Sequence, residues 1–188
     1  MTDFPSYDLD TASDAAKPLL EKSQKGFGRL PGLHKVMAGA PGLLDVYQQA
    51  HAAFQNSSFD KDELTVVWQS INVEHACHYC VPAHTGIANM MGVDAGLTEA
   101  LRDEAPLGND KLEALRSFTL AMVRQRGEVS EDQIAAFYAA GYGPQQVLEV
   151  ILGISQKVMS NYVNHVAQTP VDEVFRKFAW EKKADKAA

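Results

Sequence analysis

The chain has 188 residues, of which 46% are hydrophobic and 22% charged, as expected for a globular protein with a real core. Its length suits one domain, or one domain with a terminal extension. The net charge is -7, and an acidic chain lacks the positive surface that binds a phosphate backbone, so we expect no nucleic-acid partner. Basic side chains near the C-terminus alternate with acidic ones, which is typical of a solvated helix end.

The first residues show no basic region followed by an apolar run, so we expect no signal peptide. No apolar segment approaches the roughly 18 residues that a membrane span requires, and no membrane partner is expected. We therefore predict that the protein is cytoplasmic. In the cytoplasm structural disulfides are kept reduced. Two cysteines in Cys-x-x-Cys spacing then indicate a redox-active or metal-binding pair.

The apolar spacing predicts helices throughout, and no run shows the period-two alternation of a strand, so we expect an all-α fold. We expect an N-terminal arm and helix over 1–30, one helical domain over 31–180 and a flexible tail over 181–188. Glycine, proline and short polar clusters separate the helices. Their approximate ranges are 13–25, 33–38, 41–54, 60–74, 81–91, 97–103, 110–127, 130–141 and 144–169, with a short helix after 172.

Three of these helices begin with a capping-box pattern, in which a polar N-cap residue is followed three positions later by Glu or Gln. In this motif the two side chains bind each other's backbone N–H groups at the start of the helix. The pairs are Asp60 with Glu63, Asp110 with Glu113, and Ser130 with Gln133.

The longest periodic segment starts at Pro144 and ends before Pro170. We expect its apolar stripe to pack in the core. A capped helix, a turn and a longer helix precede Cys77, and a similar order recurs over 110–165, so an internal helical repeat is one interpretation. The apolar stripe of the segment that starts at Pro144 comprises Leu148, Ile151, Leu152, Ser155, Val158, Met159 and Tyr162.

One stretch, residues 74–84, concentrates the reactive side chains of the chain. It holds both cysteines and three of the six histidines, together with Glu74. Elsewhere the sequence shows mainly apolar helix faces and helix boundaries. We expect any chemistry to take place in this stretch.

A thiolate, rather than a thiol, attacks peroxides and disulfides, so a cysteine with the usual pKa of about 8.5 needs help. Pro82 suits the first turn of a helix that starts near Cys80, which would place this sulfur at the positive end of the helix dipole. On a helix, Cys77, Cys80 and His84 would share a face, and the imidazole could take the thiol proton directly or through a water. Glu74, three residues before Cys77, could orient or charge-balance the histidine.

Cys-x-x-Cys spacing also lets the second thiol attack whatever forms on the first. A peroxide would oxidise one cysteine to a sulfenic acid, and the other would condense with it to a disulfide and release water. An external dithiol must then reduce the pair by exchange. We expect Cys80 to attack, because His84 and the helix start are nearest to it, and Cys77 to resolve; the opposite order stays open.

Two other interpretations of the pair stay open. Cys77, Cys80 and His84, with His75 or His78, offer enough sulfur and nitrogen ligands for zinc. Structural zinc sites usually draw their ligands from two separated knuckles, however, and here all candidates fall within about ten residues. The second alternative is a pair of buried, unreactive cysteines on a helix.

The run Cys-His-Tyr-Cys-Val-Pro-Ala-His-Thr, from Cys77 to Thr85, resembles the Cys-x-x-Cys-x-x-x-His motif of the alkylhydroperoxidase D (AhpD)-like branch of the carboxymuconolactone decarboxylase family. The resemblance is most specific over residues 60–95. It implies an all-helical fold that assembles into dimers, trimers or hexamers, with the motif near a subunit contact. AhpD members are thiol peroxidases that a lipoyl-bearing or thioredoxin-like protein reduces again. The resemblance assigns the redox pair to Cys77 and Cys80 and the proton relay to His84.

Two positions depart from the family motif. The family's relay glutamate stands twelve residues before the first cysteine, where this chain has Thr65. Glu74 or Glu63 could replace it, and we prefer Glu74 on distance. The usual Asn-Gly before the first cysteine is His75-Ala76 here. The decarboxylase branch lacks the cysteine pair, so lactone decarboxylation is disfavoured.

We therefore predict a homo-oligomeric thiol peroxidase that reduces a hydroperoxide and needs no metal or bound cofactor. Its expected site residues are Cys80, Cys77, His84 and Glu74. The rival from another class is a non-enzymatic protein whose thiol pair senses redox state or holds zinc.

Residues outside the motif carry weaker signals. His165 is polar on an otherwise apolar helix, where we expect a core histidine or, alternatively, one that lines the site. His34 and His51 belong to no motif. Trp68 and Tyr79 are expected to pack beside the site.

Overall fold

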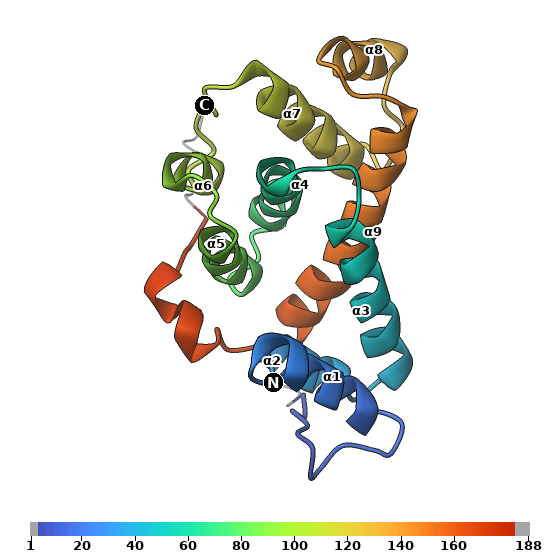
Figure 1. Cartoon of the computed structure of the whole chain (residues 1–188), viewed down its shortest axis with the longest axis vertical. Coiled ribbons are helices and arrows are strands. Elements are labelled where there is room, and N and C mark those ends of the chain that lie inside the picture. The colour runs from blue at the N-terminus through green and yellow to red at the C-terminus, as the bar shows by residue number, and fades with distance from the viewer. Residues whose placement is uncertain (1–3, 183–188) are drawn as a thin grey trace.

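The computed structural model describes residues 4–182, and every regular element in this range is a helix (Figure 1). The predicted all-α fold is confirmed. Of the tail expected over 181–188, residues 183–188 lie outside the described range. Among helices of residues 4–182, none combines the length and apolar character that crossing a bilayer requires. The elements are α1 (Lys17–Phe27), α2 (Gly32–Met37), α3 (Pro41–Gln55), α4 (Lys61–Glu74), α5 (Cys80–Met90), α6 (Ala95–Arg102), α7 (Asp110–Arg124), α8 (Glu131–Ala139), α9 (Pro144–Ala167) and the 3-10 helix η1 (Glu173–Phe178).

Helix α4 occupies the centre of the molecule and contacts α5, α6, α7 and α9 (Figure 1). It begins with the predicted capping box: the Asp60 carboxylate accepts N–H groups of the first turn, and Glu63 accepts the N–H group of Asp60. Every residue from Glu63 to Val73 is buried, because neighbouring helices surround α4. Its polar side chains must therefore find partners inside the protein.

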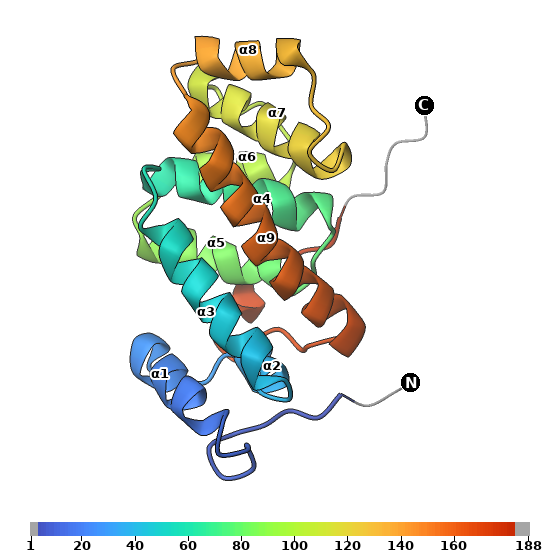
Figure 2. The same ribbon diagram turned by 90° about the vertical axis from the view of Figure 1, so that its right-hand side faces the viewer.

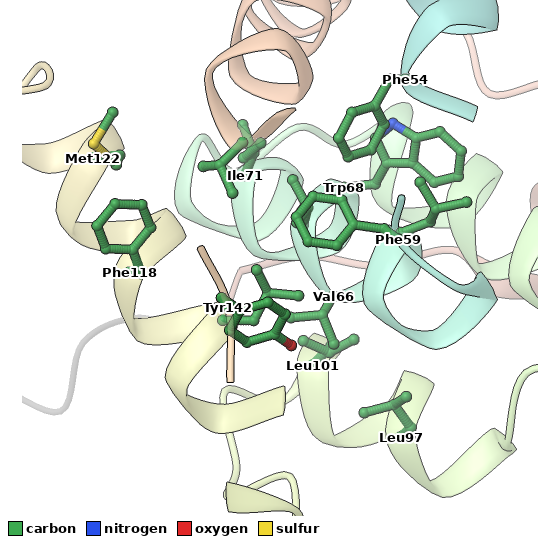
Figure 3. Close-up of a cluster of buried hydrophobic side chains, with 14 of the residues drawn as sticks. Phe54, Phe59, Val66, Trp68, Ile71, Leu97, Leu101, Phe118, Met122 and Tyr142 are labelled. Carbon is green, nitrogen blue, oxygen red and sulfur yellow. The ribbon is translucent and has the colours of Figure 1, made fainter. Parts of the chain in front are cut away.

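Large aromatic side chains hold the main core around α4 together (Figure 3). Trp68 of α4 packs edge-on against Phe54 of α3, with ring centroids 5.4 Å apart. On the other side of the cluster, Phe137 of α8 stacks between Phe118 and Tyr142 at centroid distances of 4.2 and 4.5 Å. Such pairs bury large apolar areas and favour specific ring orientations. They fix how α3, α7 and α8 are placed around the central helix.

Helix α9 runs along most of the length of the molecule beside α3 (Figure 2). Gly153 permits this close approach, because a Cβ atom there would lie 2.8 Å from the Phe54 ring and 3.0 Å from Val67. A larger residue would push α9 away from α3 and α4.

The face of α9 that packs inward is opposite to the predicted one. The apolar stripe expected in the core faces mainly outward: Leu148 is 66% exposed, Ile151 42% and Tyr162 56%. The core prediction for this stripe is confirmed only for Leu152 and Met159, which are partly buried against the core clusters, because the inward face consists largely of small and polar residues. These buried residues are Val150, Gly153, Gln156, Lys157, Ser160, Asn161 and Asn164.

The two remaining capping predictions have opposite outcomes. Ser130 and Gln133 form the expected box at α8. At α7, the side chain of Asn109 caps the helix one residue earlier than expected, so the predicted box of Asp110 with Glu113 is wrong. The Glu113 carboxylate instead accepts an N–H group from the loop before the helix.

A second hydrophobic cluster lies at the end of the molecule that holds α1 and α2, away from α8 (Figure 2). Leu20 of α1 and Leu44 of α3 are fully buried in it, and both cysteines belong to it. The N-terminal helix thus helps to enclose the cysteine stretch. The internal repeat is not confirmed, and the boundary expected at residue 30 stays a prediction.

Candidate active site

A Schellman turn joins α4 to α5 and positions the first cysteine. Cys77 donates its N–H group to the Asn72 carbonyl, and Ala76 donates to the Val73 carbonyl. Ala76 is left-handed, with φ 51°, a conformation that glycine adopts without steric cost. Cys77 is therefore fully buried in the turn before α5. The sequence had predicted that Cys77 shares a helix face with Cys80 and His84, and this prediction is wrong because Cys77 lies outside the helix.

Helix α5 begins at Cys80, in agreement with the placement of Pro82 in its first turn. The Cys80 N–H group donates to the Cys77 sulfur at 3.2 Å. Both cysteines are free thiols. The pair thus lies at the positive end of the α5 dipole, where negative charge on sulfur is favoured.

Cys80 and His84 line a cavity of about 650 Å³. Its walls come from the end of α1, from α2 and the segment between these two helices, from α3, α5 and α9, and from η1. Phe175 of η1 packs so closely on α5 that a Cβ atom on Gly86 would lie 2.4 Å from its ring. Cys77 is not among the lining residues. Cys80 is therefore the sulfur that a molecule in the cavity would meet.

Lys157 of α9 is a buried amine on the wall of this cavity. Lys157 is only 1% exposed, and its Nζ atom lies 2.9 Å from His84 Nε2. The pKa of Lys157 is lowered, because burial outweighs the opposing effect of the neighbouring cysteine charges. Burial and the Lys157 charge hold the pKa of His84 well below its usual value. His84 is therefore neutral near pH 7, and Lys157 is the group of this pair that can place a positive charge beside the cysteines.

The surroundings of Cys80 favour its thiolate. Asn164 donates its side-chain N–H to the Cys80 sulfur at 3.2 Å. Burial alone would raise the pKa of Cys80, but the hydrogen bond from the Cys77 thiol, the Lys157 charge and the Asn164 and Asn161 amides together lower it. That same hydrogen bond, followed by burial, raises the pKa of Cys77. The backbone N–H of Cys80, which donates to the Cys77 sulfur, lowers the pKa of Cys77 instead. Because more donors and the Lys157 charge act on Cys80, we assign the thiolate to Cys80.

Two histidines outside the motif, His34 and His51, also line the cavity. Burial lowers the pKa of each to about 4, so both are neutral near pH 7. The His51 ring stacks between Tyr47 and Trp68, at centroid distances of 6.2 and 5.5 Å. The Nδ1 atoms of His51 and His84 are buried and have no hydrogen-bond partner among the described residues. Both residues line the cavity, but these two ring nitrogens are themselves enclosed by the protein.

A buried amide network connects the three helices that carry the site. Asn161 of α9 donates to Asn72 of α4 at 3.0 Å, and Asn72 donates to Gln69 at 3.1 Å. His75 Nδ1 lies 2.9 Å from the side-chain oxygen Oδ1 of Asn161, and Gln69 donates to the backbone carbonyl of Val81 in α5 at 3.2 Å. The network satisfies the polar groups of the central helix and fixes α9 relative to the cysteine turn.

The two acids considered as relays are engaged elsewhere. Glu74 accepts hydrogen bonds from Arg124 Nε and Nη2 at 2.8 and 2.7 Å, and it lines a separate hollow between α4 and α7. Glu63 forms an ion pair with Lys111 at 2.8 Å. The structure therefore shows no contact through which Glu74 would orient His84.

The other sequence candidates have structural partners. His78 Nε2 lies 3.0 Å from the Thr169 carbonyl oxygen. His165 is half-buried and does not line the cavity, so neither of its two expected positions is found. Thr65 is buried and its hydroxyl donates to a carbonyl of its own helix. Within residues 4–182, no three His, Cys, Asp or Glu side chains gather as a metal ion would require.

Lys157 was not among the site residues expected from the sequence. The signal that could have revealed it is a second stripe on the same helix, in which small and amide side chains recur at helical spacing around it. The members of this stripe are Gly153, Gln156, Lys157, Ser160 and Asn164. For His34 and His51, which lie far from the cysteines along the chain, we find no local signal.

No protein-family model and no curated protein matches the chain. Solved structures do match it. An uncharacterized peroxidase-related protein from Ralstonia eutropha JMP134, described as an alkylhydroperoxidase AhpD core, has a TM-score of 0.79 and 17% identity, covering 92% of this chain and 93% of that chain. A peroxidase-related protein from Silicibacter sp. TM1040 has a TM-score of 0.76 and 19% identity, covering 93% and 96%. The chain has the AhpD-like fold.

The same AhpD-like fold is found in the debrominase Bmp8. A cysteine-to-alanine variant of Bmp8 in complex with 2,3,4-tribromopyrrole has a TM-score of 0.73 and 16% identity, covering 94% of this chain and 95% of that chain. Identities this low establish the fold alone. The chemistry of this AhpD-like chain must therefore be argued from its own residues.

Proposed function

We propose that this protein is a thiol-dependent peroxidase that reduces an organic hydroperoxide through Cys80 and Cys77. One observation carries the proposal: Cys80 lines the large cavity at the start of α5, and its N–H group donates to the sulfur of a second free thiol, Cys77, at 3.2 Å. This arrangement offers both an attacking and a resolving sulfur. The AhpD-like fold of peroxidase-related proteins supports the proposal.

In the first step, the Cys80 thiolate attacks the terminal oxygen of the hydroperoxide. The O–O bond breaks, Cys80 becomes a sulfenic acid, and the departing alkoxide takes a proton to become an alcohol. The Lys157 ammonium supplies that proton, directly or through His84. In this scheme Lys157 takes the relay role that the sequence had suggested for Glu74, and His84 positions it.

In the second step, the Cys77 sulfur attacks the Cys80 sulfenic acid. A disulfide forms, and the hydroxyl group leaves as water with the proton from the Cys77 thiol. An external dithiol then reduces the disulfide by exchange and becomes a disulfide itself, and the proton of the restored Cys80 thiol returns to Lys157. Because Cys80 is only 2% exposed, a slender lipoyl arm fits the access route better than the folded surface of a thioredoxin-like protein.

The test begins with the intact mass of dithiol-reduced protein before and after one equivalent of cumene hydroperoxide. We expect a rapid loss of two hydrogens that added dithiol reverses, and steady turnover when dihydrolipoamide is in excess. Cys80→Ser should abolish turnover, because it removes the attacking sulfur. Cys77→Ser should stop at a Cys80 sulfenic acid, which dimedone traps. Full activity of Cys80→Ser would overturn the proposal.

The same measurements separate the rival functions. A redox sensor would be oxidised once but would show no steady turnover with excess dithiol. A zinc protein would carry metal after purification, and its thiols would react with peroxide only after chelation. Either result would replace the peroxidase proposal.

Reductive debromination is a second candidate, favoured by the debrominase Bmp8 and by the aromatic lining of the cavity. The Cys80 thiolate would take bromine from an aryl bromide, and a proton would replace it on the ring. Cys77 would then displace bromide to give the disulfide. This function would be favoured over the first if the protein releases bromide from 2,3,4-tribromopyrrole faster than it reduces cumene hydroperoxide.

A further inference from the structure

The cavity is positively charged although the whole chain is acidic. The chain carries a net charge of -7, whereas three cationic side chains and a single carboxylate, Asp172, line the cavity. That carboxylate is fully engaged: it forms an ion pair with Arg29 at 2.6 Å and accepts a hydrogen bond from Tyr79 at 2.9 Å. The other two cations, Lys157 and Lys177, have no carboxylate partner among the described residues.

These two lysines lie at different depths. Lys157 is buried beside His84, and the Cys80 thiolate balances its charge. Lys177 is exposed on η1, with its Nζ 4.9 Å from the centre of the Phe178 ring. The cation without a counter-charge is therefore the one at the mouth.

Around the mouth, the wall is apolar and open to solvent. Three of the large hydrophobic side chains that the protein leaves exposed line this cavity: Phe27 at 45%, Met90 at 75% and Val174 at 51%. Exposed apolar side chains gathered at one opening are typical of a surface that meets an apolar ligand. With Lys177 beside them, they suit a ligand that is both apolar and anionic.

The inner end offers polar atoms of a different kind. The unpartnered Nδ1 atoms of His51 and His84 belong to neutral rings close to Cys80 and Lys157. A hydroperoxide group has one O–H donor and two oxygen acceptors but no full charge, so it suits an inner end lined by neutral rings. A carboxylate there would instead lie against the Cys80 thiolate and be repelled.

We infer that the cavity selects an organic hydroperoxide that also carries a carboxylate, with the peroxide group at Cys80 and the carboxylate at Lys177. The inference rests on the proposed peroxidase function and names its substrate class. The cavity volume of about 650 Å³ lies within the range of sites that enclose drug-sized ligands, and far exceeds hydrogen peroxide. The carboxylate takes no part in the reaction and leaves with the alcohol product.

The test compares three hydroperoxides of one series: cumene hydroperoxide, its para-carboxylate and the methyl ester of that carboxylate. The ester matches the acid in size but lacks the charge. We expect kcat/KM for the acid to exceed that for the ester roughly fivefold at low salt, the effect that one exposed ion pair allows, and the preference to shrink as salt screens the charge. Lys177→Gln should bring the two values together, whereas Lys25→Gln on α1, outside the cavity, should leave the preference intact.

A binding measurement keeps this test independent of turnover. Calorimetry with the carboxylated alcohol product should show weaker binding to Lys177→Gln than to the wild-type chain. If the ester and the acid are reduced equally, the selectivity is wrong and the peroxidase function stands. If no peroxide is reduced but the carboxylated alcohol binds through Lys177, the anion site stands and the function is wrong. If Lys177→Gln changes neither binding nor preference, the inference is overturned.

Discussion

At the level of single residues, the proposed chemistry depends on two buried side chains, Cys80 and Lys157. A buried charge is stable only beside a partner, and each of these groups is the counter-charge that the other needs. His84 touches Lys157 but is itself uncharged near pH 7, because burial and the adjacent cation lower its pKa. The thiolate therefore depends on an amine from α9, a helix far from the motif in sequence.

Replacing Lys157 with Met tests this dependence. Because the pKa of Cys80 is lowered, its thiolate persists in the wild-type chain as the pH falls below 7 and disappears only at more acidic pH. Without the cation the pKa of Cys80 rises from its lowered value of about 5, so alkylation by iodoacetamide at a pH below 5 should slow about tenfold for a rise of one pKa unit, and the rate should recover at alkaline pH.

Glu74→Gln is the matched control for this prediction. Its carboxylate binds Arg124 in a separate hollow, so the alkylation profile of Cys80 should not move. Circular dichroism establishes that both variants are folded. A shift of the profile in Glu74→Gln but not in Lys157→Met would restore the relay role that the sequence suggested for Glu74.

At the level of elements, the turn between α4 and α5 decides which sulfur faces the cavity. Its Schellman hydrogen bonds bury Cys77 in the turn and start the next helix at Cys80. The turn requires a left-handed residue, and Ala76 fills that position although its Cβ atom makes the conformation costly. The geometry of the thiol pair is thus maintained against a local strain.

Ala76→Gly should relieve this strain. The free energy of unfolding, measured with urea, is expected to rise by about 1 kcal/mol, because glycine adopts the left-handed conformation freely. Ala135→Gly, at an exposed position inside α8, is the control and should lower it by about 1 kcal/mol. Equal losses in both variants would show that the turn carries no such strain.

For the molecule as a whole, the outward face of α9 is the main unexplained surface. Leu148, Ile151, Tyr162 and Val166 recur on one side of the helix and are 42–66% exposed. The inward face is occupied by the polar residues of the site. A long apolar stripe left uncovered in one chain is typical of a protein contact. The homo-oligomer implied by the family resemblance stays a prediction, and we expect a second copy to cover this stripe.

Light scattering coupled to gel filtration tests the assembly. We expect the wild-type chain to elute as a dimer, trimer or hexamer at micromolar concentration, and Ile151→Glu to shift it toward the monomer by placing a charge in the apolar contact. Gln24→Glu, which adds the same charge on exposed α1, should not change the mass. A monomeric wild-type chain would contradict the prediction.

Local sequence determined most of the secondary structure and the identity of the thiol pair. Two of three capping boxes form as predicted, and Pro82 places the start of α5 at Cys80, because these signals act within a few residues. The third box is wrong because the neighbouring Asn109 competes for the same backbone N–H groups. The Cys-x-x-Cys-x-x-x-His motif can likewise be identified from consecutive residues, without knowing which distant residues pack against it.

The tertiary structure alone decided what surrounds the pair. The sequence of α9 contains two stripes, one apolar and one polar, and periodicity selects the apolar one as the core. The polar stripe is buried instead, because Asn161 and Asn164 meet partners on α4 and α5 that are more than 80 residues away. A buried polar side chain is stabilised by such partners rather than by its own neighbours in sequence. For that reason Lys157, His34 and His51 could be placed at the cavity only by the folded chain.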